Sequence, residues 1–122
     1  MPSRQSVDAF IAHVMSEDHV GAIREWYVED AWMQENQAPP REGGREALMA
    51  QEASTLARVE GVTTELAGGP LIDGDHVAIR WRFTFQLAGG GQMKMEEVAW
   101  QTWRGQKIAE ETFFYDPAQR SG

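Results

Sequence analysis

The sequence contains no cysteine, which excludes disulfide bonds and thiolate metal ligands. Its three histidines, His13, His19 and His76, are scattered along the chain and lack the spacing of a zinc ligand set. We therefore expect neither a metal nor another cofactor.

Long apolar runs are also missing, and none approaches the roughly 18 residues that a membrane-spanning helix needs. Residues 1–19 lack the positively charged start and apolar centre of a secretory signal. The sequence therefore predicts a cytoplasmic protein that does not associate with membranes.

Basic residues are scarce, with 11 lysines and arginines against 19 acidic residues and a net charge of -8. Such a charge repels nucleic-acid phosphates, so we expect no nucleic-acid partner. The 122 residues are 42% hydrophobic, which suits one domain with its own core across residues 1–122.

The first half of the chain has helical periodicity. Apolar residues recur at spacings of three and four in residues 6–15, with Ser6 as a candidate N-cap, and again in residues 19–26 and 45–60. Gly44 is the candidate N-cap of the third helix and Gly61 its stop signal. Between the second and third helices, the chain becomes extended from Ala31 and then enters a loop at Pro39.

The second half of the chain has strand periodicity. Four strands are expected at residues 62–72, 76–87, 92–103 and 107–116, because Asp73-Gly74, Gly89-Gly90-Gly91 and Arg104-Gly105-Gln106 are hairpin signals. Gly68-Gly69-Pro70 predicts a bulge or bend within the first of these strands. The sequence thus predicts an antiparallel meander that is strongly curved.

Helices followed by strands indicate an α+β fold, here a cone-shaped barrel with three N-terminal helices packed on a curved antiparallel sheet. Strand 76–87 alternates Trp81, Phe83 and Phe85 with Arg80 and Arg82. We expect one face of the sheet to line a small-molecule cavity and the other to form a homodimer.

Three stretches, together with the order of elements, resemble the nuclear transport factor 2-like superfamily, and within it the SnoaL-like proteins, ketosteroid isomerases and limonene epoxide hydrolases. They are residues 26–31 (WYVEDA), Asn36 with Pro39-Pro40 and Gly44-Arg45-Glu46-Ala47, and residues 107–116. The resemblance covers almost the whole chain and implies the same cone-shaped fold. It does not decide the reaction, because this fold serves several.

The resemblance places an acid, Glu35, where ketosteroid isomerases keep their general base. The two oxyanion-hole donors of those enzymes correspond to Ile11 and Ala99, which cannot donate. Limonene epoxide hydrolases use an aspartate, arginine, aspartate set; Arg80 matches the arginine, whereas the aspartates correspond to Arg82 and Phe113. Neither set is complete.

SnoaL-like cyclases need only one well-placed acid or base in a hydrophobic cone. We therefore expect a cofactor-independent SnoaL-like protein that binds a hydrophobic, carbonyl-bearing small molecule and performs cyclase or isomerase chemistry. The alternatives are a non-catalytic binding or dimerisation module of the same fold, and epoxide hydrolysis by a rearranged acid set.

Glu35 is the predicted general base, because burial beside Trp32, Trp81 and Trp100 would favour its protonated form and suit proton transfer near neutrality. Asn36 is a candidate for orienting the substrate. Adjacent strand residues face opposite ways, however, so one of Glu35 and Asn36 is structural unless the strand has ended.

Arg80 is the predicted electrostatic partner of Glu35. A loop of residues 88–91 places Arg82 opposite Glu97 and Arg80 opposite Ala99, either as an ordinary surface ion pair or as a site in which Arg80 binds an enolate oxygen. His13, near the edge of the first helix's apolar stripe, is a second candidate for proton transfer, or else a boundary residue. Either Glu110 or Glu111 faces the pocket, depending on the preceding turn, and Phe113 is a further candidate for substrate binding.

Overall fold

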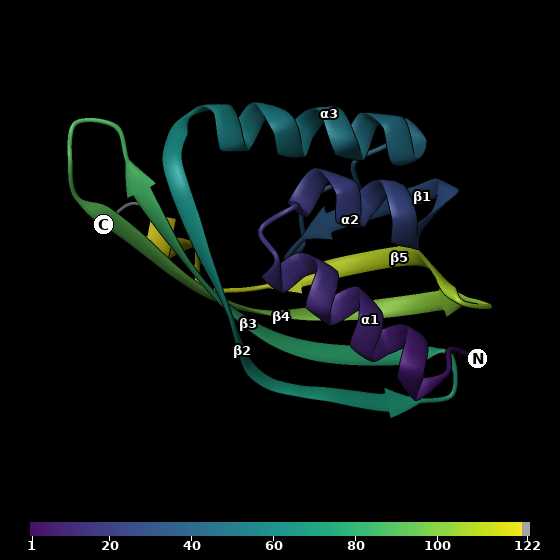
Figure 1. The fold of residues 1–122 in the computed structure, drawn as a ribbon. Helices are drawn as coiled ribbons and strands as arrows, with labels where there is room; N and C mark the ends of the chain where they lie inside the picture. Colours follow the sequence, from purple (N-terminus) through teal and green to yellow (C-terminus); the bar gives the residue numbers. More distant parts are fainter. Residues whose placement is uncertain (121–122) are drawn as a thin grey trace.

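Three helices lie over one face of a five-stranded sheet in the computed structural model, which describes residues 1–120 (Figure 1). The strand order is β1-β5-β4-β3-β2, so β1 and β2 are the edges and the sheet does not close into a barrel. The α+β class and the curved sheet under three helices are confirmed. Within residues 1–120, no helix is long and apolar enough to cross a membrane.

The helices begin at capped turns. Helix α1 spans Arg4–Met15, and its N-cap is Ser3, whose hydroxyl accepts from the backbone nitrogen of Ser6, so the prediction of Ser6 as the cap is wrong. Helix α2 spans His19–Trp26, as predicted. The carboxylate of Asp18 caps it by accepting from the backbone nitrogen of Gly21 at 3.1 Å.

Helix α3 spans Gly44–Ala57 and is shorter than predicted. Its C-cap is Arg58, and strand β2 (Val59–Asp73) begins at the next residue, so Gly61 does not end the helix. Val59 pairs with Leu87 of strand β3 (His76–Leu87). Residues 59–60 therefore belong to the sheet although their spacing also suits a helix, because pairing with β3 satisfies the hydrogen-bonding groups of their backbone.

Strand β1 (Tyr27–Glu35) makes the sheet mixed rather than wholly antiparallel. It begins four residues before the predicted extended segment and pairs parallel with strand β5 (Lys107–Phe114). The prediction of a purely antiparallel sheet counted only the last four strands, because the hairpin signals connect those alone. The long connection through α3 and β2–β4 brings β1 beside β5 in parallel.

Curvature is concentrated in β2, as predicted. Its register with β3 shifts between Leu66 and Gly68 and again between Gly68 and Leu71. Gly69 has a φ of 84°, and a side chain there would come within 2.8 Å of the carbonyl oxygen of Ala78. This bend curves the sheet toward the helices, as Figure 1 shows.

Strands β3 and β4 (Gln92–Arg104) pair one residue away from the predicted register. Arg82 lies opposite Glu96, and Arg80 lies opposite Val98, instead of Glu97 and Ala99. The loop contains one more residue than expected: Gln86 pairs with Gln92, and Gly89, Gly90 and Gly91 all adopt positive φ. Because facing residues share a side of the sheet, this shift puts Arg82 and Glu97 on opposite faces.

The hydrophobic core lies between α1, α2 and the inner face of the sheet. Phe10 makes edge-on ring contacts with Trp26, Tyr27 and Trp103 at centroid distances of 6.0–6.4 Å. Ile79 and Ala99 are fully buried neighbours on β3 and β4. This core fills one part of the concave face and leaves the rest open.

Candidate functional site

A cavity of about 290 Å³ occupies the concave side of the sheet beneath α2 and α3. Trp81, Phe83 and Phe85 form one wall, with ring centroids of successive residues 5.9 and 6.3 Å apart. The predicted alternation of β3 is confirmed, since these aromatic side chains line the cavity and Arg80 and Arg82 do not. A mostly apolar wall with a few polar groups is typical of small-molecule sites.

Glu97 projects into this cavity from β4, directly opposite Trp81. Burial, together with the nearby charges of Glu111, Glu35 and Glu52, raises the pKa of its carboxyl to about 8, although Arg120 opposes the rise. Within residues 1–120, no group hydrogen-bonds to this carboxyl. Glu97 is therefore a largely protonated acid at pH 7 whose polar atoms are available to a ligand.

Glu111 also lines the cavity and is more deeply buried, with 1% of the residue exposed. Tyr27 donates to its Oε1, and Nε2 of Gln101 donates to its Oε2 at 2.6 Å. The indole nitrogen of Trp103 in turn donates to Oε1 of Gln101 at 2.9 Å. This buried chain of hydrogen bonds fixes the carboxyl in place.

Burial raises the pKa of Glu111 to about 7, although the hydrogen bonds from Tyr27 and Gln101 oppose that rise. The pKa of Tyr27 is raised well above 10, first by its own burial and then by the charge of Glu111. Tyr27 therefore remains a donor at neutral pH. Both oxygens of Glu111 already have partners, so this carboxyl is less accessible to a ligand than that of Glu97.

Glu35 lies at the mouth of the cavity, at the end of β1. Its Oε1 accepts from the hydroxyl of Tyr115 at 2.9 Å and from Nη1 of Arg120 at 3.1 Å. The expected burial among tryptophans is wrong, because the side chain is 43% exposed and Trp100 lies on the outer face of the sheet. Glu35 lines the cavity as an ionic group held by the C-terminal segment.

Three predicted site residues lie elsewhere. Asn36 adopts a φ of 50° just after β1 and accepts from the backbone nitrogen of Tyr115 at 3.0 Å, so it ends the strand. His13 binds Asp18 at 2.9 Å and accepts from the indole of Trp26 at 3.2 Å. Trp32 lines a separate surface hollow. None of the three lines the cavity.

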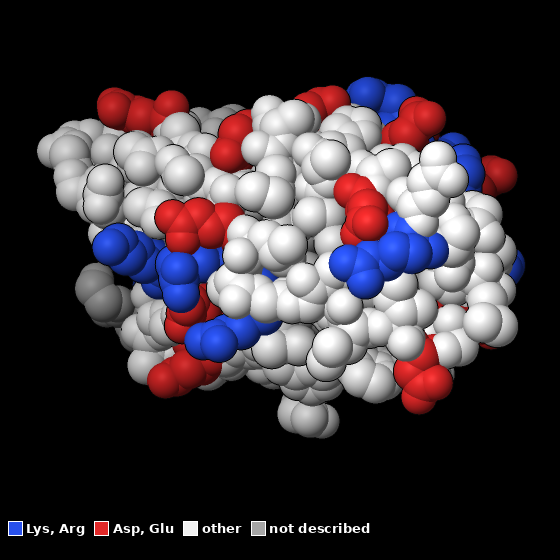
Figure 2. All heavy atoms as spheres, turned by 60° about the horizontal axis from the view of Figure 1, so that its bottom comes forward, with Lys and Arg blue, Asp and Glu red and all other residues white. Residues whose placement is uncertain are grey.

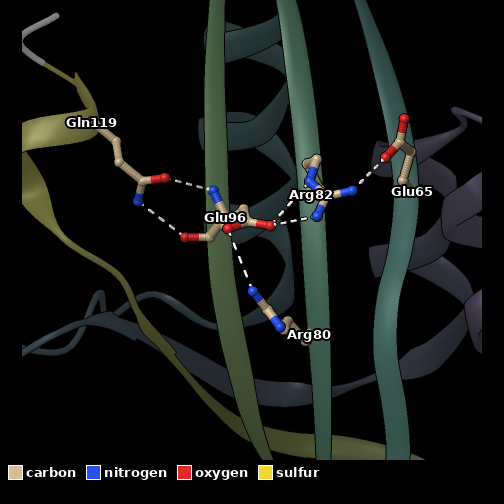
Figure 3. Close-up of polar contacts among 5 residues, drawn as sticks. All are labelled: Glu65, Arg80, Arg82, Glu96 and Gln119. Carbon is tan, nitrogen blue, oxygen red and sulfur yellow. Dashed lines mark hydrogen bonds and ion pairs between the residues drawn. The ribbon is translucent and has the colours of Figure 1, made fainter.

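Arg80 and Arg82 lie on the outer face of the sheet, where Figure 3 shows both directed at Glu96. Two nitrogens of Arg82 contact Oε1 of Glu96 at 2.9 and 2.6 Å, and a third binds Glu65 at 2.9 Å. Arg80 is 55% exposed and reaches Glu96 at 3.5 Å. The predicted ion pair thus exists with a different partner, and Arg80 does not face the cavity.

The remaining predicted residues divide between cavity and core. Phe113 lines the cavity, whereas Ala99 is fully buried in the core beside it. The choice between the two glutamates of β5 is settled by a two-residue turn and a bulge after Thr102, which turn Glu111 inward and leave Glu110 exposed.

Sequence reasoning did not identify Tyr27, Gln101, Tyr115, Arg120 or His19 as parts of the site. Gln101 had a usable signal, because strand alternation puts it on the same face as Ala99 and Trp103, where an amide needs a partner. His19 precedes Ile23 by one helical turn, which places both on the buried face of α2. Arg120 had no such signal, since it follows the last strand.

Metal ligation is not indicated within the part of the chain that the structure describes. No three or more of its histidine, aspartate and glutamate side chains converge as an ion would require. The cavity carboxyls instead bind side-chain donors, as Glu35 and Glu111 do, or none, as in Glu97.

Comparison with known proteins gives a consistent family and fold. The model of the SnoaL-like domain matches residues 7–111. None of the curated proteins matches the chain in sequence.

Several solved structures are similar over nearly the whole chain. A proposed SnoaL-like polyketide cyclase from Mesorhizobium loti is 27% identical with a TM-score of 0.77, covering 94% of this chain and 100% of that one. Another from Jannaschia sp. CCS1 is 16% identical with a TM-score of 0.82, covering 99% and 92%. A ketosteroid isomerase-like protein from Catenulispora acidiphila, solved with trimethylamine, is 20% identical with a TM-score of 0.75, covering 93% and 87%.

Proposed function

Because the chain belongs to the SnoaL-like domain family, we propose that it binds a hydrophobic, carbonyl-bearing small molecule in its cavity and performs acid–base chemistry on it without a cofactor. The observation that carries this proposal is Glu97, a carboxyl to which no group of residues 1–120 hydrogen-bonds, in a cavity walled by aromatic rings. An acid in that setting stays protonated near neutral pH and is available to a substrate oxygen.

The proposed reaction uses two carboxyl groups in opposite protonation states. The carboxylate of Glu35 removes a proton from the carbon next to the substrate carbonyl, while the neutral carboxyl of Glu97 donates a proton to the carbonyl oxygen. The product of this step is an enol, with Glu35 protonated and Glu97 ionised. Return of the proton at another carbon gives an isomer, and attack of the enol carbon on a second carbonyl closes a ring.

The contacts of the two acids support this division of roles. Arg120 and Tyr115 donate hydrogen bonds to Glu35 and hold it in place, whereas burial raises the pKa of Glu97 and favours its neutral form. Glu97 takes the electrostatic role that the sequence suggested for Arg80, because Arg80 lies on the outer face of the sheet. Epoxide hydrolysis that relies on Arg80 is disfavoured for the same reason.

Hydrogen–deuterium exchange at the α-carbon of 2-tetralone, followed by NMR in D2O, tests the proposal. We expect the wild-type protein to accelerate exchange and Glu97→Gln to lose most of that acceleration, with Glu110→Gln as the matched control on the outer face. Binding of 2-tetralone without accelerated exchange would instead favour a non-catalytic binding module. Equal rates for the wild type and Glu97→Gln would refute the role of Glu97.

We also propose that two copies associate through the outer face of the sheet. Trp100 is 48% exposed, Phe114 45% and Leu71 72%, all on this face. In Figure 2 the charged side chains of this side gather in small groups of both signs beside a broad uncharged surface. Since Arg80 and Arg82 compensate Glu65 and Glu96, the face suits a second copy of itself better than a strongly charged partner.

A further inference from the structure

His19 is a buried cavity residue that the proposed reaction does not use. Its side chain lies at the start of α2, is 8% exposed, and meets the ring of Phe83 edge-on at 5.8 Å. Both His19 and Glu52 of α3 line the cavity. A neutral imidazole has one nitrogen that donates and one that accepts. If its neighbours bind one nitrogen and thereby fix the tautomer, the other nitrogen can bind a ligand.

Glu17 and Thr64 define that tautomer. The two carboxylate oxygens of Glu17 accept from the backbone nitrogen of Thr64 at 3.0 Å and from its hydroxyl at 2.7 Å. Because a carboxylate only accepts, the hydroxyl proton is directed at Glu17, and the hydroxyl oxygen must accept from Nε2 of His19, 2.9 Å away. Glu17 also lies 3.5 Å from that nitrogen, so both acceptors favour a proton on Nε2.

The other nitrogen, Nδ1, faces Glu52. Its distance to Oε1 of Glu52 is 3.6 Å, too long for a hydrogen bond. In the neutral imidazole, Nδ1 is an acceptor, so two acceptors face each other across a gap. A group that satisfies both needs at least two donor hydrogens, and a positive charge would also complement the carboxylate.

The carboxylate of Glu52 has no arginine partner among residues 1–120. Both arginines that line the cavity are engaged elsewhere, since Arg120 pairs with Glu35 and Arg41 donates to Gln51. Glu97 and Glu111, which also line the cavity, have raised pKa values and add little negative charge near pH 7. Aromatic rings such as Phe83 add a favourable surface for an ammonium group.

We propose that His19 and Glu52 form a second polar end of the cavity, which binds a primary ammonium group of the ligand. Nδ1 of His19 and Oε1 of Glu52 each accept one ammonium hydrogen, while Thr64 and Glu17 hold the imidazole in the required tautomer. This inference rests on the proposed function and narrows its substrate class to carbonyl compounds that also carry an amino group.

Binding of benzylamine, with benzyl alcohol as the uncharged analogue, tests the ammonium site at pH 7.5. We expect benzylamine to bind at least tenfold more tightly than benzyl alcohol and to shift the Nδ1 resonance of His19 in ¹⁵N NMR spectra. The variant Glu52→Gln should lose at least tenfold in benzylamine affinity and less than twofold in benzyl alcohol affinity. Glu46→Gln, at the exposed first turn of α3, is the matched control.

The tautomer is measured on the free protein by long-range ¹H–¹⁵N correlation. We expect the Nε2-protonated tautomer of His19 in the wild type and in Thr64→Ser, and a mixture of tautomers in Thr64→Val. A proton on Nδ1 in the free wild-type protein would overturn the inference. So would equal binding of the amine and the alcohol, or absence of benzylamine binding, and neither result would affect the exchange of 2-tetralone on which the proposed function depends.

Discussion

Arg82 pairs with Glu96 across β3 and β4, and this register directs the neighbouring Glu97 to the other face of the sheet. Glu96 is thereby neutralised on the outer face, whereas Glu97 is buried opposite Trp81 without a cation of its own. The pKa values of these two adjacent glutamates therefore shift in opposite directions. That of Glu96 is lowered, chiefly by its hydrogen bond from Arg82, and that of Glu97 is raised to about 8, chiefly by burial.

Stability should fall as the pH rises from about 5 to 8. The folded protein keeps protons on Glu97 and Glu111, with pKa values of about 8 and about 7, while the unfolded chain releases them near the ordinary value of 4.5. The folded state thus binds more protons in this window, and each carboxyl lowers the free energy of unfolding by up to about 1.4 kcal/mol per pH unit. Urea unfolding at pH 5, 6.5 and 8 measures the slope.

Glu97→Gln should flatten this slope, most clearly between pH 6.5 and 8, because the amide does not titrate. Glu110→Gln, at an exposed position of β5, should leave it unchanged. An identical slope in Glu97→Gln and the wild type would contradict the assignment of a protonated carboxyl to the cavity.

Tyr27→Phe should destabilise the protein by about 1–3 kcal/mol, because it removes the donor to a buried carboxyl. The pKa of Glu111 should also rise, since the hydrogen bond from Tyr27 lowers it. Tyr115→Phe provides the control, as its hydroxyl binds Glu35 at the solvent-accessible mouth. Urea unfolding of both variants at pH 6 is the measurement, and a larger loss in Tyr115→Phe would contradict the buried network.

Glu35→Gln should reduce the exchange of 2-tetralone by about 10²- to 10⁴-fold, the range in which removal of a general base falls. Arg120→Gln should have a smaller effect, because it loosens the carboxylate without removing it. Exchange rates and 2-tetralone affinities of both variants distinguish the loss of the base in Glu35→Gln from the loss of the arginine that holds it in Arg120→Gln. Undiminished exchange in Glu35→Gln would eliminate Glu35 as the base.

Arg80→Ala should leave both 2-tetralone exchange and affinity unchanged, since the side chain lies outside the cavity. Its cost in unfolding free energy should be below about 1 kcal/mol, as for other exposed ion pairs. A large loss of exchange in this variant would indicate that Arg80 acts on the substrate and would contradict the register of β3 and β4.

Trp100→Glu should shift the protein from dimer to monomer, because it places a charge at the centre of the exposed apolar face. Analytical ultracentrifugation at micromolar concentration measures the change. The matched variant Met15→Glu alters an apolar side chain that is 42% exposed on α1, on the other side of the sheet, and should remain dimeric. A monomeric wild-type protein would refute association through this face.

Much of the fold could be read from local patterns. The helix at His19–Trp26, the hairpin turns and the bend at Gly68-Gly69-Pro70 all appear where periodicity and glycine placed them. The alternation of Trp81 with Arg82 correctly separated the two faces of the sheet. Errors arose at the ends of elements and in one register, where a single residue in a glycine loop decides the outcome.

The sequence alone determined the α+β class and the aromatic face of β3, because these depend on periodicity, while its resemblance to SnoaL-like proteins and ketosteroid isomerases indicated the family and pointed to Glu35, which lines the cavity. Only the tertiary structure decided which acids are buried and how they are paired. It brought Arg120 to Glu35, Tyr27 to Glu111 and Thr64 to His19 from distant segments, and it gave Glu97 no hydrogen-bond partner among the described residues 1–120. Burial and pairing set the protonation of a carboxyl, and both are properties of contacts that no single segment contains.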